Sequence, residues 1–255
     1  IFTNHVQSYH KDYNGGATKD MVESYLCTDG LPISLSPLYQ GDAVYENVWV
    51  NRDPRLRQTV LHPDDQAIYR YVNGPAYARY NTSTTPAIIL RYGEVLLNYA
   101  EAKAELGTIT QGDLDLSINL LRDRVAMPAM TMAVPMDPVF ANDGVSALIA
   151  EIRRERRVEL FMEGFRYDDL RRWKQGKKLE VKSYGIRWDA ANKARFDPKG
   201  EVTIKSSQVN GIDYLDIYGG TDYATPVFDE NKNYLWPIPL NDISQNPNLG
   251  QNPGW

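Results

Sequence analysis

This sequence of 255 residues has few of the residues that build covalent staples, metal centres or membrane spans. Its single cysteine, Cys27, excludes an internal disulfide framework, and we expect that side chain to be buried as a small hydrophobe. No apolar run approaches the ~20 residues that a transmembrane helix requires. The three histidines, His5, His10 and His62, lack the spacing of a zinc site. The sequence therefore predicts no metal and no cofactor.

Charge and motif content exclude further classes of protein. The chain has 33 acidic and 28 basic residues, so it lacks the basic surplus of a nucleic-acid binder. No nucleophile elbow, phosphate-binding loop or dinucleotide fingerprint is present. The acids Glu159, Glu163, Asp168 and Asp169 each have an arginine within one helical turn, which favours the ionised carboxylate and leaves no obvious proton donor. We predict that the protein is not an enzyme.

Hydrophobic periodicity predicts helices in the middle of the chain. Residues 91–106 carry apolar side chains three and four positions apart, and Gly107 ends the pattern. A second helix is predicted over 114–126, closed by Pro128, and a short connection makes the two a helical hairpin. The apolar stripe of the first helix consists of Tyr92, Val95, Leu96, Tyr99, Ala102 and Leu106.

A charged stretch, residues 146–174, contains seven arginines. Taken alone, such a stretch suggests an anion-binding helix. However, its glutamates recur every fourth residue, and pairs such as Glu151 with Arg154 and Arg156 with Glu159 lie three apart, so helical geometry makes them neighbours. We favour a salt-bridged helix pair, broken at Gly164, over phosphate binding.

Turn signals dominate both ends of the chain. Near the amino terminus we predict one short helix over 19–26, with Thr18 as its N-cap and the turn Asp29-Gly30 after it. Residues 181–233 carry weak β-like pieces such as 202–205. The last residues, 234–255, are so rich in proline and asparagine that we predict neither helix nor central strand there, but an extended strap.

Aromatic side chains with a polar edge are abundant, since the chain has 17 tyrosines and 5 tryptophans against 6 phenylalanines. A sugar presents an apolar C–H face ringed by hydroxyls, so a flat ring beside hydrogen-bonding neighbours complements it. For any single ring, packing against the scaffold remains the alternative. The predicted ligand-binding residues are Tyr9, Tyr13, Tyr39, Tyr45, Trp49, Asn47 and Arg52.

Four segments, in this order, carry a family resemblance. They are MVESYLCTDGLPI with DPRLRQTV, RYGEVLLNYAEAKAELG, ERRVELFMEGFRYDDLRRW, and the tail YLWPIPLNDISQNPNLGQNPGW. Together they resemble the SusD/RagB family of outer-membrane nutrient-binding lipoproteins. The resemblance implies a mostly α fold, with tetratricopeptide-like helical hairpins, long irregular aromatic-rich loops and the carboxyl-terminal strap. It also implies that the chain is the carboxyl-terminal half of a longer protein whose amino-terminal part carries a lipidated cysteine.

The resemblance organises the chain and implies a function. Residues 1–90 form a loop-rich ligand-face segment, residues 91–180 a tetratricopeptide-like helical region, and residues 181–255 a loop region with the strap, together one domain. The implied function is non-catalytic capture of oligosaccharide or polysaccharide at the extracellular face of the outer membrane. The implied partner is a SusC-like TonB-dependent transporter, and a lipid anchor makes the membrane contact. The alternatives are a helical scaffold that docks the transporter without touching glycan, and the binding of peptide nutrients.

A second set of aromatic residues, Tyr184, Trp188, Tyr214, Tyr218 and Tyr223, follows the arginine-rich helices. It lies in a stretch rich in glycine, lysine, asparagine and aspartate. The sequence offers no means of deciding whether this set rims the ligand face or the transporter contact.

Overall fold

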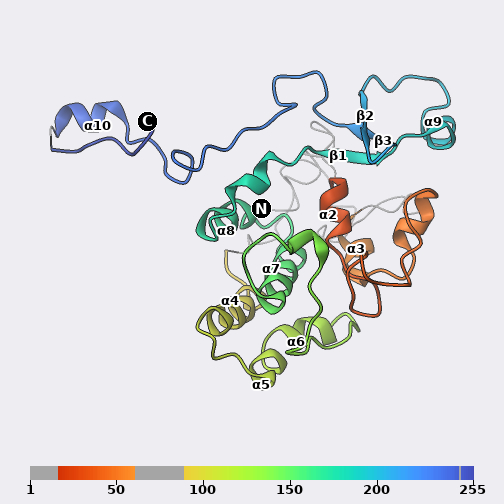
Figure 1. Ribbon diagram of the computed structural model, residues 1–255, viewed down its shortest axis with the longest axis horizontal. Helices are drawn as coiled ribbons and strands as arrows, with labels where there is room; N and C mark the ends of the chain where they lie inside the picture. Colours follow the sequence, from red (N-terminus) through yellow and green to blue (C-terminus); the bar gives the residue numbers. More distant parts are fainter. Residues whose placement is uncertain (1–16, 61–88, 247) are drawn as a thin grey trace, which may run out of the picture. The chain divides into compact units, whose positions relative to one another are not determined.

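The computed structural model describes residues 17–60, 89–246 and 248–255 (Figure 1). The chain divides into two compact units, Ile1–Leu160 and Phe161–Trp255, and each is described here by itself. Helices predominate among the described residues, which confirms the prediction of a mostly α fold. The predicted ligand-binding residues Tyr9 and Tyr13 lie outside the described ranges, as do all three histidines.

In the described part of the first unit, α2, Lys19–Glu23, comes first, and Thr18 accepts a hydrogen bond from the Met21 amide as predicted. The helix ends three residues earlier than expected, at a Ser24 hydroxyl that donates to the Asp20 carbonyl. Gly30, at φ +79°, makes the predicted turn. After a long loop, α3, Pro54–Thr59, starts from the Asp53 cap, with proline in its first turn.

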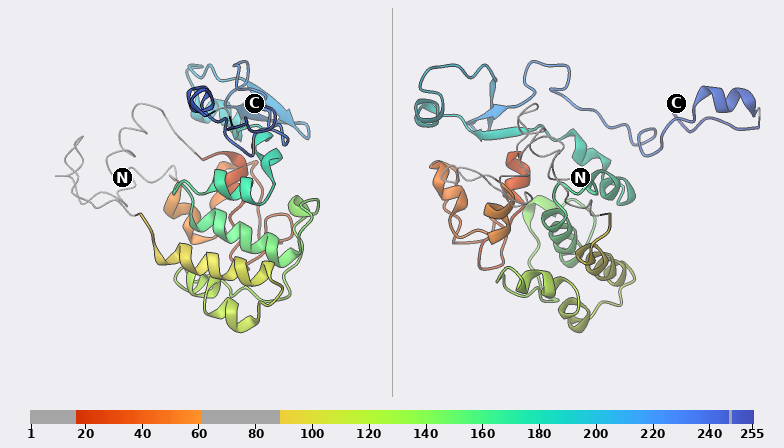
Figure 2. Two further views of the ribbon diagram at one scale, coloured as in Figure 1. Left: turned by 90° about the vertical axis from the view of Figure 1, so that its left-hand side faces the viewer. Right: turned by 180° about the vertical axis from the view of Figure 1, so that it is seen from behind.

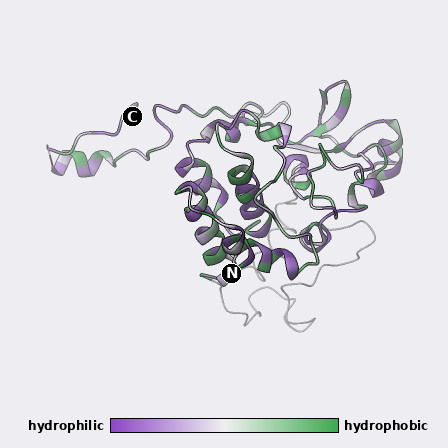
Figure 3. Cartoon of the chain, turned by 60° about the horizontal axis from the view of Figure 1, so that its bottom comes forward, coloured by the Kyte–Doolittle hydropathy of each residue, from purple (hydrophilic) through white to green (hydrophobic). Residues whose placement is uncertain are grey.

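The centre of the first unit is the packing of α4, Tyr92–Glu105, against α7, Ala147–Glu159 (Figures 1 and 2). Leu97 and Ala100 on α4 and Ile152 on α7 are all almost fully buried. Hydrophilic and hydrophobic residues are interspersed along the helices of the protein (Figure 3). Within the described ranges, none of the helices combines the length and apolar character that a bilayer crossing needs.

The predicted helix over 91–106 is confirmed, but the expected apolar stripe is mostly on the outside. Tyr92, Val95, Tyr99 and Leu106 are exposed, and of that stripe only Leu96 is buried. The buried face consists instead of Gly93, Leu96, Leu97, Ala100, Glu101 and Ala104. Small side chains on that face let α7 approach closely, which a count of large apolar residues does not reveal.

The second predicted helix, over 114–126, is wrong as a single element. The structure has α5, Gln111–Asp115, and α6, Ile118–Asp123, separated at Ser117. Ser117 leaves helical dihedral angles, at φ −132° and ψ −93°, and its hydroxyl donates to the Asp113 carbonyl. A local side-chain hydrogen bond thus competes with the helical ladder at this residue. A short 3-10 turn, η3, Pro138–Phe140, precedes α7.

The second unit begins with α8, Arg166–Arg172, and η4, Gly176–Glu180. The break at Gly164 is confirmed by its φ of +88°. A three-stranded antiparallel sheet follows in the order β1-β3-β2, with α9, Ala190–Phe196, between β1 and β2. The strands are β1, Tyr184–Arg187, β2, Ser206–Val209, and β3, Ile212–Asp216. The β-like piece expected at 202–205 is wrong, because the strand begins at Ser206.

The carboxyl-terminal tail is ordered as predicted but includes a helix, which we did not expect. Helix α10, Leu240–Gln245, fits between Pro239 and the next proline, a stretch in which every residue still has its amide hydrogen. Beyond it the chain turns back, so that Gln251 exchanges two hydrogen bonds with Ile238 and the Trp255 indole donates to the Leu235 carbonyl (Figure 1). The final residues therefore clamp the tail onto itself.

Candidate functional site

Five of the seven predicted ligand-binding residues lie on one loop of the first unit. The loop begins at Cys27 and ends at Arg52, and an isolated antiparallel bridge joins these two residues. Two further backbone bonds close its neck, Thr28 amide to Asn51 carbonyl and Asp53 amide to Leu26 carbonyl, each 2.9 Å. Cys27 itself is fully buried, as predicted. The loop is therefore a closed excursion from the core, a common carrier of binding residues.

Three rings on this loop form the candidate platform. Tyr45 and Trp49 stand at the two ends of η1, Tyr45–Trp49, with ring centroids 6.1 Å apart in an edge-to-face pair. Tyr39 lies shortly before them, and all three rings are half-buried. Asn47 sits between the paired rings and its amide donates to the Gln40 carbonyl over 3.4 Å. The arrangement brings flat rings together with a polar amide, as glycan binding requires.

Arg52 occupies a different environment from the rings. Its side chain is buried, with the whole residue only 5 % exposed. Nη2 donates to the carbonyls of Val22 and Tyr25 at 2.7 and 2.9 Å, and Nη1 donates to the Val48 carbonyl at 3.1 Å. The guanidinium carbon lies 5.5 Å from the centre of the Tyr39 ring. Arg52 therefore belongs to the interior of the site rather than to its outer surface.

Burial, together with the nearby carboxylates of Asp42 and Glu23, raises the pKa of the Tyr39 phenol to about 12, against the opposing effect of Arg52. Tyr39 therefore keeps its proton throughout the physiological range. Its hydroxyl can both donate and accept a hydrogen bond, as sugar hydroxyls do. Burial also lowers the pKa of Arg52, although an arginine keeps its charge at neutral pH.

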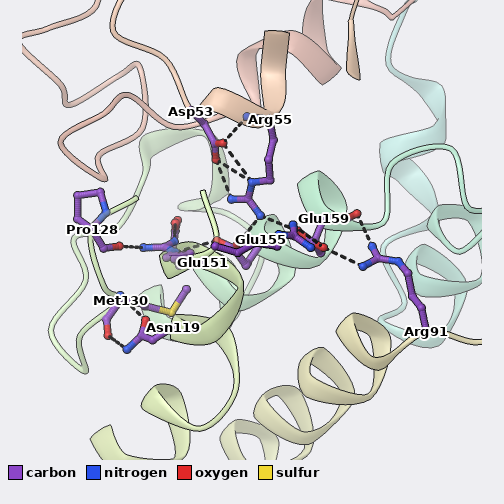
Figure 4. A network of polar contacts seen from close by, with 11 residues as sticks. Asp53, Arg55, Arg91, Asn119, Pro128, Met130, Glu151, Glu155 and Glu159 are labelled. Atoms are coloured by element: carbon purple, nitrogen blue, oxygen red, sulfur yellow. Dashed lines mark hydrogen bonds and ion pairs between the residues drawn. The ribbon is translucent and has the colours of Figure 1, made fainter. Parts of the chain in front are cut away.

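The neck of the loop is anchored in a buried network of arginines and carboxylates (Figure 4). Asp53, next to Arg52, accepts from Arg55 Nη2 at 2.7 Å, and Arg55 Nη1 donates to Glu155 at 2.6 Å and to Glu159 at 2.9 Å. Glu155 also accepts from Arg122 at 2.8 Å. Bidentate and shared guanidinium contacts of this kind fix geometry as well as charge.

This network bears on whether the arginine-rich segment, residues 146–174, forms salt bridges or binds an anion. The Glu151–Arg154 pair is confirmed at 2.9 Å, and Arg154 also pairs with Asp137. Burial alone would raise the pKa of Glu155, but Arg55 and Arg122 outweigh it and hold that pKa at about 2. The carboxylate is thus charged and already bound by two guanidiniums. The geometry favours the structural interpretation of the segment over anion binding.

The second aromatic set separates into buried and exposed members in the second unit. Trp188 and Tyr214 are buried in the small sheet, whereas Tyr218 is 46 % and Tyr223 75 % exposed. The exposed pair stands edge-to-face with ring centroids 6.3 Å apart. Sequence alone could not make this distinction, because both kinds of tyrosine lie among the same glycines and polar residues.

Aliphatic neighbours of the platform are missing from the sequence-based site. Leu38, Val44 and Val50 lie on the same loop and are all exposed, with Val44 at 52 %. They widen the apolar area around the rings. These three residues lie among turn residues rather than in a periodic segment, and this position in the sequence could have identified them as part of the site. In the described part of the chain, no group of three histidine, cysteine, aspartate or glutamate side chains is arranged to hold a metal ion.

Comparison with known proteins identifies the family. The model of the SusD family matches residues 66–255. The chain belongs to the SusD family. A SusD-like protein P2 from Formosa agariphila is 29 % identical over 201 residues, covering 77 % of this chain and 31 % of the relative. A SusD-like protein from Bacteroides ovatus is 29 % identical over 175 residues, covering 65 % of this chain and 29 % of the relative.

Solved structures support the same fold. A SusD-like carbohydrate binding protein from Bacteroides fragilis matches with a TM-score of 0.60 and 26 % identity, over 91 % of this chain and 48 % of that protein. A second SusD-like protein from Bacteroides fragilis matches with a TM-score of 0.56 and 23 % identity, over 94 % of this chain and 47 % of that protein. The chain thus spans about half the length of these structures and under a third of the curated relatives.

Proposed function

We propose that this SusD-family chain takes part in non-catalytic capture of oligosaccharides, with the loop between Cys27 and Arg52 supplying stacking rings. The observation that carries the proposal is the cluster of Tyr39, Tyr45 and Trp49, half-buried on a loop that the core holds firmly. Rings fixed in this way lose little conformational entropy when a sugar stacks on them. The carbohydrate-binding relative of known structure supports the same ligand class.

The cellular setting of the proposal follows the family. We place the protein at the extracellular face of the outer membrane, held by a lipid anchor and delivering glycan to a SusC-like TonB-dependent transporter. Capture and hand-over require no bond cleavage, and the buried carboxylates of the network are engaged by arginines rather than poised as acid and base. Incubation with bound glycans should therefore release no reducing ends, and their release would refute the non-catalytic part of the proposal.

The first test is calorimetric titration of the intact protein with a panel of neutral and acidic oligosaccharides and polysaccharides. We expect binding to a neutral glycan, because the Tyr39 phenol lies near the carboxylates of Asp42 and Glu23, which disfavour an anionic sugar. Absence of binding across the panel would favour the alternative of a helical scaffold that docks a transporter without touching glycan. Binding to peptides from a parallel panel would favour the alternative of peptide uptake.

The second test asks which ring binds the sugar. Trp49→Ala should weaken affinity about fivefold or more, since stacking of a flat ligand on an aromatic ring contributes about 1–3 kcal/mol in the comparable case of nucleobases, and should leave the melting temperature nearly unchanged. Tyr92→Ala is the matched control, because this exposed tyrosine lies on α4 rather than on the loop. A large drop in melting temperature with normal affinity would show that Trp49 serves packing instead.

A further inference from the structure

One guanidinium links every part of the candidate platform. Arg52 reaches the end of α2 through the carbonyls of Val22 and Tyr25, and it reaches η1 through the carbonyl of Val48. Its guanidinium also lies over the Tyr39 ring.

Most donors of Arg52 are committed to the protein. Three carbonyl bonds use both hydrogens of Nη2 and one of Nη1, whereas Nε is buried without a hydrogen-bond partner, and the side chain is almost completely buried. Val22 lies in the last turn of α2 and Tyr25 lies two residues beyond its end, so both carbonyls stand at a helix C-terminus, where a cation is favourable. Because the residue is only 5 % exposed, a ligand stacked on the outer rings has little access to the guanidinium.

We propose that Arg52 is a positioning residue, which holds the rings of Tyr39, Tyr45 and Trp49 in binding geometry without touching the glycan. This inference rests on the proposed function and revises the sequence-based role of Arg52 as a direct ligand contact. A planar fork with fixed donor directions can bridge α2 and η1 at once, whereas the ammonium of a lysine is a single point of attachment on a flexible stem. A positive charge alone is therefore not sufficient to hold α2 and η1 together.

The decisive experiment compares Arg52→Lys with Arg122→Lys in the intact protein. Both arginines are buried and both replacements keep the positive charge, but Arg122 bonds to Glu151 and Glu155 in the helical core. Both variants should lower the melting temperature. At a temperature well below both transitions, Arg52→Lys should weaken binding of the best neutral glycan about tenfold, and Arg122→Lys less than twofold.

A double-mutant cycle separates positioning from direct contact. If Arg52 acts through the rings, Arg52→Lys should weaken affinity less than twofold when Trp49→Ala is already present. The reason is that both substitutions remove the same stacking contact with the ligand. If the full tenfold loss persists in that background, Arg52 contacts the ligand and the proposal is wrong. An unchanged affinity in the single variant would refute it as well.

Hydrogen exchange tests the positioning without any ligand. Arg52→Lys should accelerate amide exchange across residues 36–52, and Arg122→Lys should leave that segment as in the wild type. Unchanged exchange in Arg52→Lys would overturn the proposal. If the wild-type protein bound no glycan at all, the proposed function would fail, and exchange would still decide whether Arg52 orders the rings.

Discussion

The two units use their cations in contrasting ways. In the first unit, Arg55, Arg122 and Arg154 are almost fully buried and each faces at least two carboxylates. In the second, the guanidinium of Arg171 lies 5.4 and 5.8 Å from the rings of Tyr167 and Trp236, while its Nε donates to the Tyr234 carbonyl. One unit is ordered by buried charge pairs, and the other largely by packing of rings and partly exposed cations.

The contrast implies a different sensitivity to mutation. A buried carboxylate that serves two arginines cannot be removed without leaving uncompensated charge in the interior. A cation over an exposed ring contributes only about 0.5–1 kcal/mol, because water and other side chains can replace it. We therefore expect mutations in the buried network of the first unit to cause large losses in the free energy of unfolding. Mutations in the tail of the second unit should cause small, local losses.

The largest effect should come from Glu155→Gln. The change keeps the side-chain shape but removes the charge that Arg55 and Arg122 share. We expect a loss of about 3 kcal/mol in the free energy of unfolding, at the lower end for a broken buried pair because both arginines keep another carboxylate. Urea denaturation measures it. Glu105→Gln, at a more exposed pair with Arg153, is the control and should cost less than about 1 kcal/mol.

Acid should remove part of the same stabilisation. The pKa of Glu155 is depressed from 4.5 to about 2, so its contribution is complete above pH 4.5 and falls as pH drops toward 2. The difference in stability between wild type and Glu155→Gln should therefore shrink over this range. A difference that stays constant from pH 6 to pH 2.5 would contradict the ionised buried pair.

A smaller effect, about 2 kcal/mol, is expected from Gly176→Ala in the second unit. A methyl group at Gly176 would lie 2.1 Å from a ring carbon of Phe228, so the ring would have to move. Gly250→Ala is the matched control, because a methyl group there meets nothing within 4 Å. Thermal unfolding measures both variants, and equal melting temperatures would show that the Phe228 contact does not order this unit.

The smallest effect should come from Trp255→Ala. The indole donates to the carbonyls of Lys232 and Leu235, and the Lys232 ammonium lies 4.1 Å from the ring centre. We expect a change in global stability below about 1 kcal/mol, with faster amide exchange confined to residues 232–238. A loss of global stability comparable to that of Glu155→Gln would contradict the comparison, because the tail would then stabilise residues outside itself.

Local signals in the sequence were reliable where the partner lies within a few residues. Thr18 caps α2, Gly107 follows α4, and Gly164 interrupts the charged segment, each as predicted. The predictions failed where a distant element decides. The outward face of α4 was mistaken for its packing face, because Gly93 and Ala100 carry little apolar signal although α7 packs there. The break at Ser117 is an exception, because its cause is local: the Ser117 hydroxyl donates to the carbonyl of Asp113, four residues earlier. The helix in the tail was also missed.

The candidate site divides in the same way. Composition pointed to ring-bearing loops, and Tyr39, Tyr45, Asn47 and Trp49 indeed lie on one loop. For Arg52, we now propose a positioning role in place of the predicted direct contact with ligand. The neighbouring residues in the sequence do not indicate that its side chain is buried. Its acceptors Val22 and Tyr25 come from a helix some thirty residues earlier in the chain.

The sequence by itself determined the family, the helical character and the positions of caps and turns, because these depend on side chains a few bonds from the backbone they control. Only the tertiary structure decided which charges meet. Glu155 finds Arg55 one hundred residues away, and spacing along a helix can specify only neighbours three or four apart. The same holds for Arg52, whose role follows from three carbonyls that folding alone brings within its reach.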